Sequence, residues 1–199
     1  VDMLRDSDLD EAQRRQLHVI EQSGNTLLDL INDVLDYSRL DAGKMPIEQT
    51  GLDLPALIGE CVALFEHRAR LNANALSENL DPDLGEYCVG DPVRLRQILV
   101  NLISNAVRYS PQGSMVRVVT EQARGQARIM VIDQGSGVAI ADRERIFDKF
   151  ERLGRDDAGG SGLGLYISRR LARAMGGDIE IGGAVGEGAR FILSLPART

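Results

Sequence analysis

Residues 159–168 read GGSGLGLYIS, a glycine run directly before a stretch that is typical of a helix. Glycine lets the backbone approach a ligand closely, and the free N–H groups at a helix start favour an anion such as phosphate. The spacing of Gly160, Gly162 and Gly164 fits neither the dinucleotide-binding fingerprint nor the P-loop, since Leu165 stands where the fingerprint needs its third glycine. Phosphate is the natural occupant, and a flexible loop before a helix is the alternative.

A second set of polar side chains lies in NLISNAVRY, residues 101–109. Asn101, Asn105 and Arg108 are three and four residues apart, so they share one face of a helix. An asparagine carbonyl suits Mg²⁺, but two neutral ligands hold that ion poorly unless phosphate oxygens complete its coordination. The pattern therefore indicates a metal that arrives with a nucleotide, and a solvated polar face is the alternative.

Asp133 ends an apolar stretch and is followed by Gly135 and Gly137, a sequence that often forms only a turn. A carboxylate at this point could accept a hydrogen bond from the exocyclic amine of adenine. It would face the carbonyl of guanine, so it could select ATP over GTP.

A further motif, IFDKFER at residues 146–152, is interpreted as a helix end packed on the core. The polar, glycine-punctuated stretch that follows it to Gly160 would suit a mobile lid over phosphates.

The elements that must position these residues change in character near Gly43. Before it, Asp10 and Gln13 can cap a long helix that runs to Leu40. Its apolar residues form a narrow seam, which predicts packing against a neighbouring helix and a second copy of the chain. Docking of this helix on its own body is the alternative. The seam consists of Leu17, Ile20, Leu27, Ile31 and Val34.

After Gly43, helical and strand patterns alternate, which predicts an α/β sandwich. Asp91 and Pro92 begin a helix that should run through Val107, and a second helix is expected over about 165–175. The expected strands are 116–120, 127–133, 178–181 and 190–195.

Composition excludes several functions for these 199 residues. The net charge of −7 and the lack of a long basic run argue against nucleic acid or an anionic membrane surface as the main partner. Cys61 and Cys88 lack metal-ligand spacing and are expected to be reduced core residues. No apolar run is long enough for a membrane span and no signal peptide opens the sequence, so we expect no membrane contact by this segment.

In this order and spacing, the four motifs resemble those of the sensor histidine kinases and of the ATPase superfamily they share with gyrase, the Hsp90 chaperones and the MutL repair proteins. The resemblance covers nearly the whole chain. It implies an α+β fold in which a mixed sheet packs on helices around a Bergerat-type ATP pocket, preceded by a long helix of a dimeric helical hairpin bundle. It also implies a division into a partial dimerisation hairpin, residues 1–44, and a catalytic ATP-binding domain, residues 45–199.

The resemblance implies ATP and Mg²⁺ as cofactors and assigns roles to matching residues. Asn105 would be the Mg²⁺ ligand and Asn101 its helper, while Arg152 would reach the γ-phosphate. The residues implied to contact the nucleotide are Asn101, Asn105, Arg108 (phosphate), Tyr109 (packed on adenine), Asp133 (adenine amine), Gly135, Gly137, Gly160, Gly162, Gly164 and Leu165.

Two positions separate this chain from its relatives. Gyrase-type members place a water-activating glutamate where this chain has Asn101, so we expect phosphoryl transfer to outcompete hydrolysis. Gly186 and Gly188 resemble the last glycine box, in which Thr often precedes Phe. Here Arg190 precedes Phe191, which puts that part of the adenine wall in doubt.

The chain has no stretch like the His-Glu-x-x-Thr-Pro that carries the phosphoacceptor in these kinases. His18 and His67 are interpreted as ordinary helix residues. Residues 28–44, LDLINDVLDYSRLDAGK, resemble the second hairpin helix and its hinge, and Val1–Arg5 would be the tail of the first helix. We therefore expect the sequence to begin just after the phosphoacceptor histidine.

Two functions remain open at this point. The first is the catalytic region of a sensor histidine kinase that passes phosphate to an absent histidine and then to a response-regulator aspartate. The second is a nucleotide-silent module whose helical arm binds another kinase or a regulator. The resemblance implies a homodimer through the helical arm, a response regulator or receiver domain as partner, and a cytoplasmic location within a membrane-anchored bacterial sensor.

Overall fold

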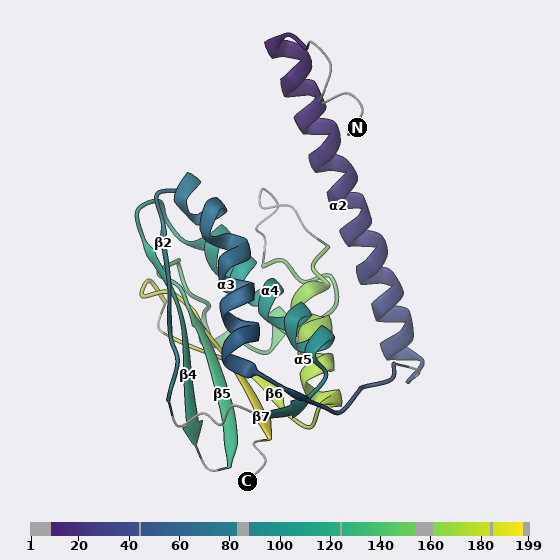
Figure 1. Ribbon diagram of the computed structural model, residues 1–199, viewed down its shortest axis with the longest axis vertical. Helices are drawn as coiled ribbons and strands as arrows, with labels where there is room; N and C mark the ends of the chain where they lie inside the picture. The colour runs from purple at the N-terminus through teal and green to yellow at the C-terminus, as the bar shows by residue number, and fades with distance from the viewer. Residues whose placement is uncertain are drawn as a thin grey trace.

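The computed structural model describes residues 9–43, 45–82, 88–123, 125–153, 161–183 and 185–196. They form a two-layer α/β body and a long helical arm, α2 (Figure 1). The α+β fold class expected from the sequence, with a mixed sheet packed on helices, is confirmed. The helices are α2 (Glu11–Asp41), α3 (Leu54–Leu71), α4 (Pro92–Tyr109) and α5 (Gly164–Ala174). The strands are β1 (Thr50–Leu52), β2 (Ala75–Asn79), β3 (Cys88–Gly90), β4 (Met115–Ala123), β5 (Gln126–Ile132), β6 (Asp178–Gly182) and β7 (Arg190–Pro196).

The main sheet has five strands in the order β2-β4-β5-β7-β6. Only β2 and β4 pair in parallel, and the other pairs are antiparallel. Side chains alternate between buried and less buried along β4, β5 and β7, as expected for a sheet that turns one face to the core. Figure 1 shows α3, α4 and α5 together on one side of this sheet. Strands β1 and β3 form a separate antiparallel pair.

Helix α4 is the centre of the helical layer and carries the amides of interest. Its apolar stripe is buried, and fully burying each Leu or Ile contributes about 1.5–3 kcal/mol. Asp91 caps the helix by accepting from the N–H groups of Val93 and Arg94, at 3.0 and 3.1 Å. Its other oxygen accepts from the N–H of Glu48 at 3.1 Å, which fixes the connection from α2 to the body. The stripe consists of Leu95, Ile98, Leu99, Leu102, Ile103, Ala106 and Val107.

The long helix agrees closely with the prediction. Asp10 and Gln13 form the expected capping box, with each side chain accepting from the other's backbone N–H, at 2.8 and 3.0 Å. Among the seam residues, Ile20, Leu27, Ile31 and Val34 are exposed. The other end of the arm docks on the body, where Asp36 accepts a hydrogen bond from Gln97 at 2.6 Å. Docking on the body is therefore seen at one end of the arm, while packing of the exposed seam against a second copy of the chain stays a prediction.

Other sequence expectations meet mixed outcomes. Helix α4 runs two residues past Val107. The interpretation of residues 146–152 as a helix end is wrong. Only a 3₁₀ turn, η2 (Arg145–Phe147), in which Phe147 is buried, precedes an irregular segment in which Phe150 is exposed. Cys61 is buried and free, as expected. The side chain of Cys88, residues 1–5 and the expected lid from 154 to 160 lie outside the described residues.

None of the described helices combines the length and the apolar character that crossing a membrane requires.

Candidate functional site

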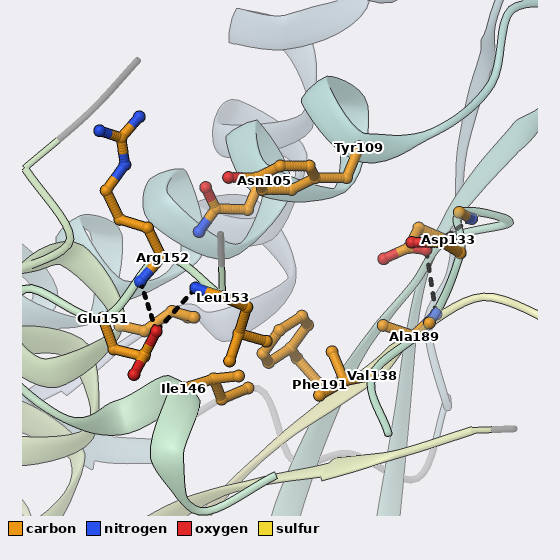
Figure 2. A pocket seen from close by; sticks show the side chains of 14 residues that line it. Asn105, Tyr109, Asp133, Val138, Ile146, Glu151, Arg152, Leu153, Ala189 and Phe191 are labelled. Atoms are coloured by element: carbon orange, nitrogen blue, oxygen red, sulfur yellow. Dashed lines mark hydrogen bonds between the residues drawn. The ribbon is translucent and has the colours of Figure 1, made fainter. Parts of the chain in front are cut away.

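A pocket opens where the ends of α4, β5 and β7 meet the segment after η2. Its volume is about 620 Å³, including open solvent at its mouth. Figure 2 shows Asp133 toward one end of the pocket, with Asn105 and Arg152 toward the other. The apolar side chains of Val138, Ile146 and Phe191 lie between these polar groups, so the pocket can hold a flat apolar ring system with charged groups beyond it.

Asp133 follows directly after β5, and the backbone holds its carboxylate in place. Its Oδ1 accepts from the N–H of Gly135 at 2.8 Å and of Ala189 at 3.0 Å, and only 5% of the residue is exposed. Among the described residues, no group donates a hydrogen bond to its Oδ2. A buried carboxylate needs partners for its remaining lone pairs, so Oδ2 is suited to accept from a bound ligand.

Two glycines allow the chain to pass close to Asp133. A Cβ at Gly135 would lie 2.7 Å from the carbonyl oxygen of Tyr109. A Cβ at Gly188 would lie 1.9 Å from the carbonyl oxygen of Asp133, and Gly188 also has φ +95°. Both positions therefore require glycine, and together they join β5, β7 and the end of α4 around the carboxylate.

The amides of α4 lie one behind the other. Asn105 lines the pocket, and its Nδ2 donates to Oδ1 of Asn101 at 3.3 Å. Asn101 does not line the pocket, and its Nδ2 donates to the hydroxyl of Ser168 on α5 at 2.9 Å. One turn after Asn105, Tyr109 lines the pocket, whereas Arg108 is exposed and lies outside the described lining.

The opposite wall is built by Glu151, Arg152 and Leu153. The Glu151 carboxylate accepts from the N–H groups of Arg152 and Leu153, at 2.9 and 2.7 Å (Figure 2). It also accepts from Nε of Arg145 at 2.8 Å. The hydrogen bond from Arg145, with that from Leu153, lowers the pKa of Glu151. A carboxylate of lowered pKa is a weak base, so Glu151 is suited to hold this segment rather than to activate water.

The glycines of the opening motif have packing reasons in this structure. Gly162 has φ +70°, and a Cβ there would lie 2.8 Å from the backbone carbon of Phe150. A Cβ at Gly164 would lie 2.6 Å from Oδ1 of Asn101. Neither residue is part of the described pocket lining, while Leu165 is, and Gly160 lies outside the described residues. The close approach that glycine permits here is to the protein's own chain.

The structure thus brings most of the predicted residues together. Seven of them line the pocket: Asn105, Tyr109, Asp133, Gly135, Gly137, Arg152 and Leu165. Sequence reasoning missed seven others: Ser136, Val138, Ile146, Glu151, Leu153, Ala189 and Phe191. Strand alternation could have found Ala189 and Phe191, because residues two apart share one face of a strand. The same alternation explains Arg190, whose side chain is exposed and is not part of the described lining.

A family model described as histidine kinase-, DNA gyrase B- and HSP90-like ATPase matches residues 90–199. The chain belongs to this ATPase family. The matched residues include every described part of the pocket. A second family model, the phospho-acceptor domain of histidine kinases, matches residues 1–43, which include all of α2.

The chain is similar over most of its length to curated sensor kinases. It is 35% identical over 192 residues to the signal transduction histidine-protein kinase BarA of Escherichia coli strain K12, covering 93% of this chain and 21% of the relative. It is 38% identical over 199 residues to the circadian input-output histidine kinase CikA of Synechococcus elongatus, covering 96% of this chain and 26% of the relative. The chain therefore spans about a quarter or less of these relatives.

Solved structures of histidine kinases share this ATPase-family fold. Full-length ShkA, crystallised in complex with AMPPNP, matches with a TM-score of 0.85 and 34% identity, over 98% of this chain and 41% of the other. The catalytic domain of the histidine kinase ThkA, in a nucleotide-free form, matches with a TM-score of 0.67 and 28% identity. That match covers 75% of this chain and 96% of the other.

Proposed function

We propose that these residues are the ATP-binding catalytic region of a two-component sensor histidine kinase. The region would transfer the γ-phosphate of ATP to a histidine outside these 199 residues, for relay to a response-regulator aspartate. The observation that carries the proposal is the buried carboxylate of Asp133, with one oxygen held by two backbone N–H groups and the other without a donor among the described residues. The AMPPNP complex of the similar kinase ShkA supports a nucleotide in this pocket.

At the adenine end, Oδ2 of Asp133 would accept a hydrogen bond from the exocyclic amine. Gly135 and Gly137 would allow the base to lie close to the backbone, and Tyr109 would pack on its ring. Leu165 and Phe191 supply apolar surface to the same pocket. A guanine would place a carbonyl oxygen against the carboxylate, so the site would select ATP.

At the phosphate end, Asn105 would offer its amide oxygen and Arg152 its guanidinium. The described residues hold no group of three or more His, Cys, Asp and Glu side chains that could bind a metal, so phosphate oxygens must supply most ligands of a Mg²⁺ ion. The neutral, hard oxygen of Asn105 fits that ligand set. When bound, Mg²⁺ would neutralise charge that develops on the transferring phosphoryl group.

Five further residues have proposed supporting roles at this end. Arg108 would contact phosphate, and Gly160, Gly162 and Gly164 would form the loop that closes around the phosphates. Asn101 would act as the helper of Asn105 through their hydrogen bond.

The chemistry proposed is transfer rather than hydrolysis. Of the two carboxylates in the described lining, Asp133 is held at the adenine end, and the pKa of Glu151 is lowered. Asn101, which stands where gyrase-type members have their glutamate, carries no basic group. A histidine brings its own nucleophilic nitrogen, so the pocket needs only to position and neutralise the phosphoryl group.

We further propose that residues 1–44 are part of a dimerisation hairpin and 45–199 the catalytic domain. Four exposed apolar residues of α2, Ile20, Leu27, Ile31 and Val34, would pack in a homodimer. A response regulator or receiver domain would be the next acceptor, and the region would work on the cytoplasmic side of a membrane-anchored bacterial sensor.

The test is phosphorylation of the whole protein with Mg²⁺ and γ-labelled ATP. We expect a labelled, acid-labile and base-stable phosphoryl group, as a phosphorylated imidazole nitrogen gives, and its loss in Asn105→Ala. Acid-stable label, or labelling that Asn105→Ala leaves unchanged, would contradict the proposal.

A second candidate is a nucleotide-silent module that binds another kinase or a regulator through α2, and the exposed seam favours it. Arg190 gives no reason to think the pocket lost, because its side chain does not line it. The second candidate would be supported if the whole protein bound a partner through α2 while binding no ATP.

A further inference from the structure

We propose that Ser168, on α5, is a positioning residue that acts through Asn101 to orient the amide of Asn105. The inference rests on the proposed function, because it takes Asn105 as the residue that holds the ion accompanying ATP. Ser168 lies outside the described pocket lining, so its effect must be transmitted by a neighbour.

Ser168 is a polar residue in an apolar layer. It is 1% exposed, and its neighbours on the same helix, Ile167, Leu171 and Ala172, are buried as well. A buried hydroxyl is costly unless it is hydrogen-bonded. The Ser168 hydroxyl meets this need by accepting from Nδ2 of Asn101, at 2.9 Å, across the contact between α5 and α4.

The bond to Ser168 determines which way the Asn101 amide faces. An asparagine side chain has one accepting oxygen and one donating NH₂ group. Because Nδ2 of Asn101 points to Ser168, Oδ1 is turned to Asn105 and accepts from its Nδ2 at 3.3 Å. Asn105 is thereby left with an amide oxygen to which no described residue donates. That oxygen is the atom a metal ion needs.

Reversing this chain of bonds would make the site unfit for a cation. If the Ser168 hydroxyl donated, Asn101 would have to accept from it and donate to Asn105 instead. Asn105 would then accept with its oxygen and turn its NH₂ group to the pocket, and an NH₂ group cannot ligate a cation. Metal binding therefore requires Ser168 as an acceptor at the far end of the chain of bonds.

The glycine-rich motif packs against the same series of hydrogen bonds. A Cβ at Gly164 would lie 2.6 Å from Oδ1 of Asn101 and 3.2 Å from its Nδ2. The start of α5 thus packs directly on the Asn101 amide, leaving no room for another side chain there. The segment that sequence reasoning assigned to phosphate binding is linked in this way to the orientation of Asn105.

The experiment measures how much Mg²⁺ strengthens ATP binding by this chain, using calorimetric titrations in Mg²⁺ and in EDTA. Ser168→Ala should reduce the gain from Mg²⁺ about tenfold, as removal of an outer-shell partner of a metal ligand does, and leave affinity in EDTA unchanged. Ser104→Ala is the matched control, because the Ser104 hydroxyl donates to the backbone carbonyl of Asn101, at 3.0 Å, and not to its side chain. It should retain the gain from Mg²⁺.

A double-mutant cycle separates action through Asn101 from a direct effect. In an Asn101→Ala background, Ser168→Ala should cause no further loss. Additive losses, an unchanged gain from Mg²⁺ in Ser168→Ala, or an equal loss of affinity in EDTA would each overturn the positioning role. Asn105→Ala tests the underlying assumption separately: if it keeps the full gain from Mg²⁺, the proposed metal role of Asn105 is what fails.

Discussion

Replacing Asp133 by asparagine changes the hydrogen bond offered to the base while keeping the two that hold the side chain to the backbone. The amide oxygen of the new side chain can accept from the N–H groups of Gly135 and Ala189, as Oδ1 does now at 2.8 and 3.0 Å. Its NH₂ group then takes the place of Oδ2. We therefore expect the free energy of unfolding of Asp133→Asn to stay within about 1 kcal/mol of the unmodified protein.

The effect on ATP should be large, because two donors would face each other. Losing a hydrogen bond to a charged acceptor costs about 1.5–3 kcal/mol, and an unpaired buried donor costs about 1–3 kcal/mol. A combined loss of about 3 kcal/mol corresponds to roughly 100-fold weaker binding. Inosine triphosphate carries a carbonyl in place of the amine, so Asp133→Asn should bind it better than the unmodified protein does.

The assay is calorimetric titration of both proteins with ATP and inosine triphosphate, beside thermal unfolding. Asp133→Ala is the control for the fold, since it leaves two buried N–H groups without an acceptor and should lower stability by about 2–4 kcal/mol. The reasoning is refuted if Asp133→Asn binds ATP as tightly as the unmodified protein, or if its preference between the two nucleotides does not shift toward inosine triphosphate.

Three further predictions concern stability and assembly. Gly188→Ala should lower the free energy of unfolding by about 2 kcal/mol or more, because its Cβ would lie 1.9 Å from a backbone oxygen. Gly186→Ala is the control, since Gly186 has φ +85° but nothing within 4 Å of its Cβ position, and it should cost only about 1–2 kcal/mol. Equal melting temperatures of the two variants would count against the contact at Gly188. Burial raises the pKa of Asp178, but hydrogen bonds from Arg173 and Arg169 outweigh it and lower that pKa from its usual 3.8 to about 2. The stability that this ionised carboxylate adds is complete above pH 3.8 and disappears as the pH falls through 2. In denaturant titrations, the unmodified protein should therefore exceed Asp178→Asn in free energy of unfolding by an amount that shrinks across that window. A difference that stays constant with pH would contradict the prediction. Ile31→Asp, in the exposed seam of α2, should convert the expected dimer to a monomer in light-scattering measurements, and an unchanged mass would place the interface elsewhere.

Local sequence patterns were sufficient for the elements with strong caps and periodicity. The Asp10 and Asp91 caps both form, because the side-chain oxygens that define them accept from N–H groups two or three residues away. The strands of the sheet centre were found by alternation, although β4 and β7 run further than predicted where the pairing with β5 continues, and β5 lies one residue earlier than predicted.

The errors arise where long-range contacts decide the structure. Phe150 was expected to pack on the core. It is exposed instead, with φ +62°, because its N–H donates to the carbonyl of Gly162, twelve residues away. Ser168 had no signal at all, since its partner Asn101 is 67 residues distant. Such pairings depend on how segments distant in the sequence pack together, which no local pattern encodes.

The central claim is that ATP binds between Asp133 and Asn105. It is tested most directly by titrating Mg²⁺ and ATP into the isotope-labelled 199-residue chain and following its amide resonances. The account predicts saturable shifts of the backbone amides of Gly135, Gly137 and Ala189 and of the side-chain amide of Asn105. A folded chain whose resonances do not move, or move only along the exposed seam of α2, would contradict it.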